Sequence, residues 1–231
     1  TDSEDVCEFT ENGDAFRGGA IYMDIGGNLS LTNCTFSSNI ADLDGGAVYT
    51  ISNVEASNCA FGANIASEGW GGALEIYQPG EVLEFEFDQC IFAGNNAVWG
   101  GAIHTQDFKG AFNECYFFSN TAESGGGVYM SNGEGLDGSD SVMMTNCQVI
   151  SNIATDGDEI NIGGGGLAAV VTQLTVENSI FQSNTAEGDD GFAGGLLFYG
   201  GDPSFVQTVK NCLFLDNEAE MGRSEERRVG K

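Results

Sequence analysis

One motif recurs along the whole chain of 231 residues. Its clearest copy runs from Asn33 to Tyr49 and reads Asn-Cys-x-Phe-x-x-Asn-x-Ala, a short gap, then Gly-Gly-Ala-aliphatic-Tyr. The Cys-x-Phe-x-x-Asn half occurs eight times at intervals of 25 to 33 residues, with Val149 once replacing Phe and Ser179 once replacing Cys. A repeat of this period predicts a solenoid in which each copy contributes one structural unit.

Short segments between the two halves of the motif alternate apolar and polar residues. Leu83-Glu-Phe-Glu-Phe and Leu174-Thr-Val-Glu are two of them, and no window shows a sustained helical spacing of apolar residues. Alternation with period two is typical of strands. We therefore predict an all-β fold, a right-handed parallel β-helix of about seven to eight coils, in which each strand pairs with its counterpart in the next coil.

In-register pairing would place equivalent residues of successive coils on top of one another. We expect Phe and Cys to form interior stacks, Asn to form a ladder at a turn where it adopts the left-handed conformation, and Gly-Gly to form a corner. The ladder and stack residues are Asn39, Asn64, Asn95, Asn120, Asn152, Asn184, Cys34, Cys59, Cys90, Cys115 and Cys147.

The cysteines occupy a single repeat position, with seven in the whole chain. A disulfide framework normally joins different positions, and parallel side chains fit the disulfide dihedral poorly. We favour buried free thiols that fill the interior, with bridges between neighbouring coils as the alternative.

Phe-x-x-Asn combined with Gly-Gly-Ala-Ile, as at Gly18-Gly19-Ala20-Ile21, resembles the repeat of the chlamydial polymorphic outer membrane proteins. It also resembles the wider superfamily of right-handed, pectin-lyase-like β-helices. The resemblance covers about residues 7–219. It implies export to the cell surface, the outer membrane if the source is bacterial, and adhesion.

The formal net charge is −28. Nucleic acids and anionic lipids require basic residues, so this charge excludes them as partners and suits an extracellular setting. No apolar run is long enough for a spanning helix, so we expect no membrane insertion by this chain.

We expect one repeat domain over residues 1–222, a fragment that lacks at least one cap. The last residues, 223–231, break both the repeat and the acidic trend, and a common sequencing-adapter string encodes them in one reading frame. We interpret them as a non-native tail.

One pair of aromatic residues marks the best candidate binding site. Trp70 and Trp99 each precede Gly-Gly in successive coils, so they should stack at one corner, with Glu75 and His104 on the adjoining strand. We expect that strand face, which carries the Ala47 and Tyr49 columns, to be exposed. Aromatic platforms beside polar groups hold sugar rings, so this corner is a candidate glycan site. The alternative is that large corner residues only shield the backbone.

Acidic insertions suggest a second kind of site. Carboxylates converging from one loop can bind Ca²⁺, and the candidates are Asp156, Asp158, Glu159, Asp189 and Asp190. None fits a known calcium-binding repeat, so solvated charge is the alternative, and no other cofactor is expected.

These features favour a non-catalytic secreted or cell-surface protein whose partner is a glycan or a host cell-surface protein. The alternative is a polysaccharide lyase or glycoside hydrolase on the same scaffold. A lyase would need a base among Arg17, Lys109 and Lys210, which lie at unrelated repeat positions. A hydrolase would need clustered carboxylates, for which Glu75, Glu84 and Glu86 are strand candidates.

Overall fold

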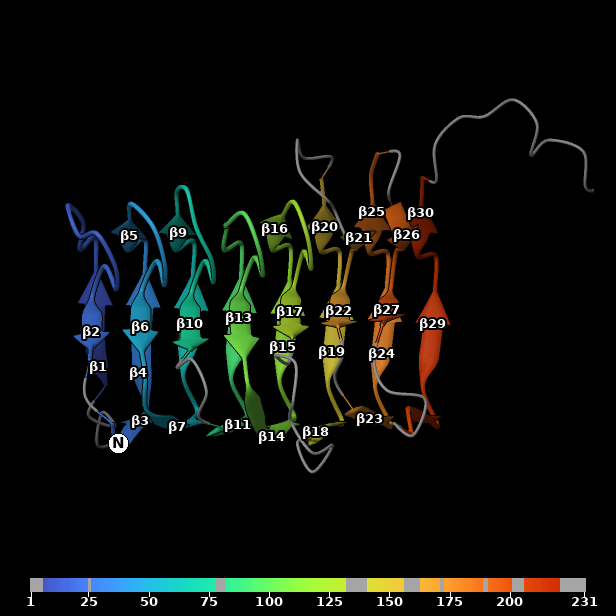
Figure 1. The fold of residues 1–231 in the computed structure, drawn as a ribbon, viewed down its shortest axis with the longest axis horizontal. Helices are drawn as coiled ribbons and strands as arrows, with labels where there is room; N and C mark the ends of the chain where they lie inside the picture. The colour runs from blue at the N-terminus through green and yellow to red at the C-terminus, as the bar shows by residue number, and fades with distance from the viewer. Residues whose placement is uncertain are drawn as a thin grey trace, which may run out of the picture.

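The structure is a computed structural model that describes residues 6–24, 26–77, 82–131, 141–155, 163–170, 173–188, 191–200 and 206–220. In these ranges the chain forms strands and turns and no helix. The strands stack in parallel along one axis, horizontal in Figure 1, with the coils in chain order from one end to the other. The predicted parallel β-helix is confirmed.

Three long sheets form the walls of the helix. The first, which we call the Phe sheet, contains β1 (Cys7–Thr10), β4 (Cys34–Ser37), β8 (Ala60–Gly62), β12 (Ile91–Ala93), β15 (Tyr116–Phe118), β19 (Gln148–Ile150), β24 (Ile180–Gln182) and β29 (Leu213–Leu215). The second, the Tyr sheet, contains β2 (Ile21–Met23), β6 (Val48–Thr50), β10 (Leu74–Tyr77), β13 (Ile103–Gln106), β17 (Val128–Ser131), β22 (Leu167–Val170) and β27 (Leu196–Tyr199). The third, the base sheet, contains β3 (Asn28–Thr32), β7 (Asn53–Ser57), β11 (Leu83–Asp88), β14 (Phe108–Asn113), β18 (Ser141–Thr145), β23 (Gln173–Glu177) and β28 (Thr208–Lys210).

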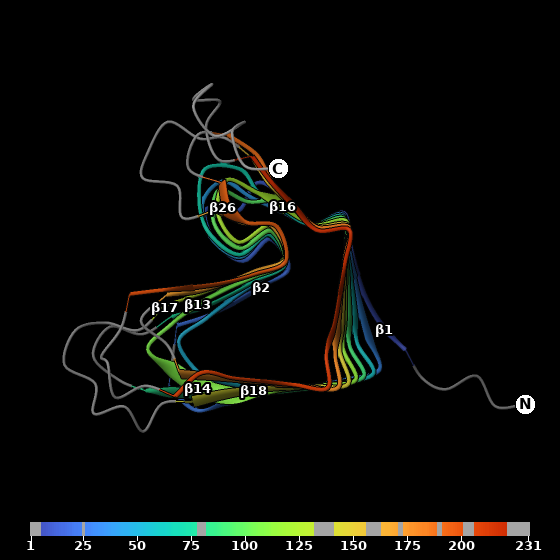
Figure 2. The same cartoon turned by 90° about the vertical axis from the view of Figure 1, so that its right-hand side faces the viewer.

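Shorter strands build an upper lobe between the Phe sheet and the Tyr sheet (Figure 2). They are β5 (Ile40–Ala41), β9 (Ile65–Ala66), β16 (Thr121–Ala122), β20 (Ile153–Ala154), β21 (Gly163–Gly164), β25 (Thr185–Ala186), β26 (Gly191–Ala193) and β30 (Glu218–Ala219).

The chain passes from the base sheet to the Phe sheet, the upper lobe and the Tyr sheet, and then back to the base sheet. Seen from the C-terminal end in Figure 2, this path runs anticlockwise while it advances toward the viewer, so the helix is right-handed. Counted from one base-sheet strand to the next, six complete coils run from β3 to β27, with part of a coil before them (β1 and β2) and part of a coil after them (β28 and β29). As a number of complete coils, the expected seven to eight is therefore slightly too high, because the coils at the two ends are partial in the described residues.

The interior is a column of stacked side chains. The rings of Phe36, Phe61, Phe92 and Phe117 are buried and nearly parallel, with successive centroids 4.8 to 4.9 Å apart. This distance equals the usual strand spacing, so the rings stack because the backbone register places them there. Val149 continues the column. The predicted cysteine stack is also interior: Cys34, Cys59, Cys90, Cys115 and Cys147 are buried, and all seven thiols of the chain are free.

The asparagine ladder is confirmed, and each side-chain amide in its middle donates two hydrogen bonds and accepts two. Asn95 shows the pattern: its Nδ2 donates to Oδ1 of Asn120 (2.9 Å) and to the carbonyl of Phe61 (3.0 Å). Its Oδ1 accepts from the backbone N–H and the Nδ2 of Asn64 (3.0 and 2.9 Å). The expectation that these asparagines are themselves left-handed is wrong. The left-handed residue is the one before, such as Ser38 (φ 56°) before Asn39, which turns the amide inward.

The glycine pair forms the corner for two different reasons. Gly71 has φ of 64°, in the left-handed region that favours glycine. Gly72 does not, but a Cβ there would overlap the carbonyl oxygen of Gly101 in the next coil. Close stacking of the corners therefore depends on the second glycine.

Candidate functional site

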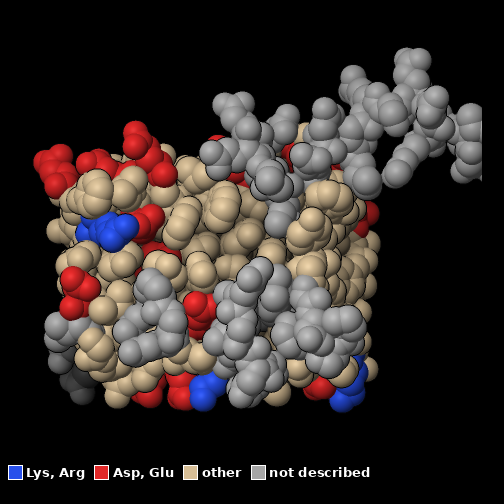
Figure 3. All heavy atoms as spheres, viewed as in Figure 1, with Lys and Arg blue, Asp and Glu red and all other residues tan. Residues whose placement is uncertain are grey.

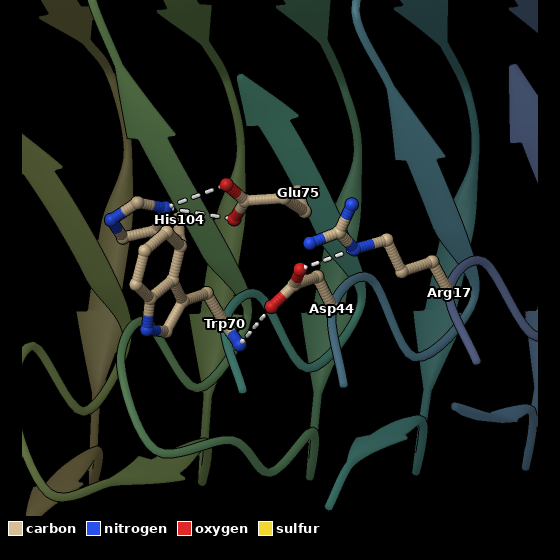
Figure 4. Close-up of polar contacts among 5 residues, drawn as sticks. All are labelled: Arg17, Asp44, Trp70, Glu75 and His104. Carbon is tan, nitrogen blue, oxygen red and sulfur yellow. Dashed lines mark hydrogen bonds and ion pairs between the residues drawn. The ribbon is translucent and has the colours of Figure 1, made fainter. Parts of the chain in front are cut away.

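The predicted site lies where the upper lobe folds over the outer face of the Tyr sheet (Figures 2 and 4). Tyr49, Glu75, His104 and Tyr129 occupy one register column of that face. The expectation that this column is exposed is wrong. Glu75 and His104 are 0% and 1% exposed, and Tyr49 is also buried. Sequence alternation identifies this as the outward face of the strands, but the returning loops of the upper lobe cover it.

Ala47 was also expected to face outward. It is fully buried and packs in the main core together with its counterparts at the same corner, Ala73 and Ala102. A small side chain fits there because it lies directly after the glycine pair, where successive coils approach most closely.

The two tryptophans stack as predicted. The Trp70 and Trp99 rings lie 5.7 Å apart at 11°, and both residues are half-buried. Trp70 also lies 4.9 Å from the His104 ring, and Trp99 lies 5.3 Å from the Tyr129 ring. The rings therefore form one aromatic cluster that holds the upper lobe against the Tyr sheet. In later coils, Ala168 and Leu197 continue this second, smaller core.

Two separate sets of polar contacts lie beside these rings (Figure 4). His104 Nδ1 lies 2.7 and 3.0 Å from the two carboxylate oxygens of Glu75. Arg17 Nε donates to Asp44 (2.7 Å), and Asp44 accepts the backbone N–H of Trp70 (3.2 Å). The Arg17 guanidinium also lies 4.9 Å from the centroid of the Tyr49 ring.

Burial controls the electrostatics of these groups. Burial raises the pKa of the Glu75 carboxyl above its ordinary value, and His104 opposes that shift. Burial likewise raises the pKa of the Tyr49 and Tyr129 hydroxyls, which Arg17 counteracts at Tyr49. A carboxylate and an imidazole enclosed in this way can hold a proton between them, but they do not face solvent.

Arg17 and Asp44 are site residues that the sequence reasoning missed. Each stands directly before Gly-Gly, the position that Trp70 and Trp99 occupy in the following coils. Reading that whole column, rather than its aromatic members alone, would have predicted the four side chains to lie in a row.

The predicted calcium ligands Asp156, Asp158, Glu159, Asp189 and Asp190 lie outside the described residues. Within the part of the chain that the structure describes, no three His, Cys, Asp or Glu side chains come together to hold a metal ion. On the face shown in Figure 3, acidic side chains gather along the upper edge over the N-terminal coils and along the lower edge.

The base sheet carries an open groove of about 610 Å³ on its outer face. Among its lining residues are Glu55, Glu84, Glu86 and Lys109. Two of the carboxylates expected for a hydrolase, Glu84 and Glu86, therefore lie in the groove, whereas Glu75 is buried under the upper lobe. Lys109 Nζ lies 2.7 Å from Glu84 Oε1, and both side chains are largely exposed. A surface ion pair of this kind contributes little to stability.

Two segments of the chain, residues 33–51 and 89–106, match the family model of the Chlamydia polymorphic membrane protein repeat. Each match covers a Phe-sheet strand, the upper-lobe turn and a Tyr-sheet strand, with the Phe-x-x-Asn and Gly-Gly-Ala motifs inside it. Comparison with curated proteins and with solved structures gives no match. The described residues contain no helix that is long and apolar enough to cross a membrane. The chain is thus a β-helix whose repeats resemble those of the Chlamydia family.

Proposed function

We propose that this chain is a non-catalytic β-helix displayed at a cell surface or secreted, where it binds a glycan or a protein of another cell. The resemblance to a repeat of outer-membrane-type proteins supports the location. The observation that carries the proposal is how the repeat uses its residues: Phe, Cys, Asn and Gly-Gly serve the interior and the corners. Outward columns then vary from coil to coil, as expected of a scaffold that presents contact surfaces.

The enclosure of the Glu75–His104 pair favours a structural role for it. A general acid or base must come within hydrogen-bond reach of its substrate, and a side chain exposed by 0 to 1% does not meet this requirement without opening of the lobe. Trp70 and Trp99 are half-buried, so part of each residue reaches the surface of the cluster. We place a candidate glycan contact on these rings.

The test measures binding and turnover side by side. The chain is applied to an array of neutral and charged glycans and to cultured cells, and in parallel to polysaccharides, with reducing ends and unsaturated uronates measured with and without Ca²⁺. We expect saturable binding and no product. Turnover that Trp99→Phe leaves intact, and that substitution of carboxylates abolishes, would refute the proposal.

A carbohydrate-active enzyme is the second candidate. The groove beside Glu84 and Glu86 favours it, because a hydrolase needs two carboxylates on one cleft. If this candidate is correct, Glu84→Gln and Glu86→Gln each abolish product formation, while Glu177→Gln on the same sheet leaves it unchanged.

A further inference from the structure

The outer face of the Phe sheet is mainly apolar from β8 onward, and its apolar side chains are exposed on β12, β15 and β29. Its strands keep an unbroken register, so the residues on either side of each Phe form two outward columns. Ile91, Tyr116, Phe118 and Leu213 are 45 to 51% exposed in these columns. Contiguous exposed apolar surface of this kind marks an interaction site more often than chance.

This face is also almost free of charge, although the chain carries a net charge of −28. The turns that border it are occupied mainly by Asn at the start of each strand, as at Asn58 and Asn146, and by Ser at the end, as at Ser119 and Ser151. From β4 to β24, Glu114 is the only charged residue in the two outward columns and the two rows of turn residues, and the two end strands add Glu8, Glu11 and Asp216. A polyanion or a polycation would find no partner charges here, so the face suits an uncharged ligand.

The shape of the face distinguishes between uncharged partners. Eight strands spaced by about 4.8 Å give a length of about 34 Å, and three to four residues per strand give a width of about 10 to 13 Å. The planar area of about 340 to 440 Å² is roughly half of the ~800 Å² that each partner buries in a typical stable protein interface. A second copy of this chain would be held poorly, whereas a narrow extended polymer matches the outline.

We infer that the outer face of the Phe sheet binds an uncharged polysaccharide chain laid along the helix axis. A pyranose ring has an apolar face and hydroxyl groups at its rim. The apolar faces would lie on the columns that contain Tyr116 and Phe118, and the hydroxyls would meet the amides and hydroxyls of the bordering turns. This inference rests on the proposed function and names its ligand class, and it adds a second contact surface, separate from the one proposed at Trp70 and Trp99.

The experiment compares matched surface variants of the whole chain. Tyr116→Ser with Phe118→Ser removes the two aromatic residues from the face. Met143→Ser removes an equally exposed apolar side chain from the outer face of the base sheet and is the control. Binding is measured to insoluble cellulose and chitin, to soluble mixed-linkage glucan and galactomannan, and to the charged polymers alginate and heparin. Circular dichroism establishes that each variant is folded.

We expect binding to at least one uncharged polysaccharide, about tenfold weaker in the double variant, unchanged in the control and insensitive to salt. Binding that the double variant retains, or binding to charged polymers alone, overturns the inference and leaves the proposed function standing. If sedimentation shows a dimer that the double variant abolishes, the partner of this face is a second copy of the chain and not a polysaccharide. Degradation of a bound polysaccharide refutes the proposed non-catalytic function, while the variant comparison still decides where the chain binds.

Discussion

The asparagine ladder makes a sharp prediction at Asn95, which lies in its middle. Asn95→Ala removes four hydrogen bonds, two that its Nδ2 donates and two that its Oδ1 accepts, all between buried groups. Each such bond contributes about 1 kcal/mol net, and more where a buried partner is left unsatisfied. We therefore expect the free energy of unfolding to fall by about 4 kcal/mol.

The neighbouring residue provides the matched control. Asn96 is exposed, and its side chain makes one long hydrogen bond, 3.4 Å, to the carbonyl of Thr121. Asn96→Ala should change the unfolding free energy by about 0.5 kcal/mol or less. Urea denaturation followed by circular dichroism measures both variants. The ladder argument is refuted if the two differ by less than about 1 kcal/mol.

Asn95→Asp tests the accepting and the donating roles of the side-chain amide separately. A carboxylate still accepts both bonds from Asn64, but it presents negative charge to the carbonyl of Phe61 and to Oδ1 of Asn120. Burial would raise its pKa, so the folded state would hold the proton more tightly than the unfolded state. The loss of stability relative to the natural chain should therefore grow as the pH rises above the ordinary range of carboxyl groups, and a loss that is constant with pH would contradict this.

Three further outcomes follow from other buried groups. Burial raises the pKa of Glu75, so above the ordinary pKa of glutamate the folded state binds more protons than the unfolded state, and Glu75 lowers stability as the pH rises from that value. Glu75→Gln should therefore make the melting temperature depend less on pH between pH 4 and 8. An unchanged slope would contradict this. Under native conditions, Ellman's reagent should label the exposed Cys7 and the half-buried Cys212 quickly, and it should label the five buried cysteines only at the rate of unfolding. Fewer than seven reactive thiols in non-reducing denaturant would instead indicate disulfide bridges. The Thr105 hydroxyl is buried and has no hydrogen-bond partner among the described residues, so Thr105→Val should stabilise the fold by about 1 kcal/mol in urea titrations. A loss of stability would show that the hydroxyl is satisfied.

The repeat allowed most of the architecture to be predicted, because in-register stacking turns a sequence column directly into a spatial column. Phe36, Asn39 and the Trp70–Trp99 pair lie where the motif places them. Handedness followed from a general rule for crossovers between parallel strands, which does not depend on these residues.

The environment of Glu75 and His104 could not be predicted in the same way. Alternation along a strand identifies its two faces, but it says nothing about whether a loop from another part of the coil covers one of them. The upper lobe covers the outer face of the Tyr sheet and leaves that of the Phe sheet open (Figure 2). The exposed apolar surface at Tyr116 and Phe118 was not predicted either, because these residues occupy the variable positions on either side of the repeated Phe.

The ladder has a consequence for how such a chain can change in evolution. The side chain of each ladder asparagine bonds only to the neighbouring asparagines and to the carbonyl of the Phe position in the coil before it. A unit of 25 to 33 residues can therefore be gained or lost in phase, and the stack will close in the same register. Recombination between similar repeats would lengthen or shorten every face by about 4.8 Å in a single event. Repeat number would then set how far the molecule extends toward a partner, independently of the surface residues that decide which partner it holds.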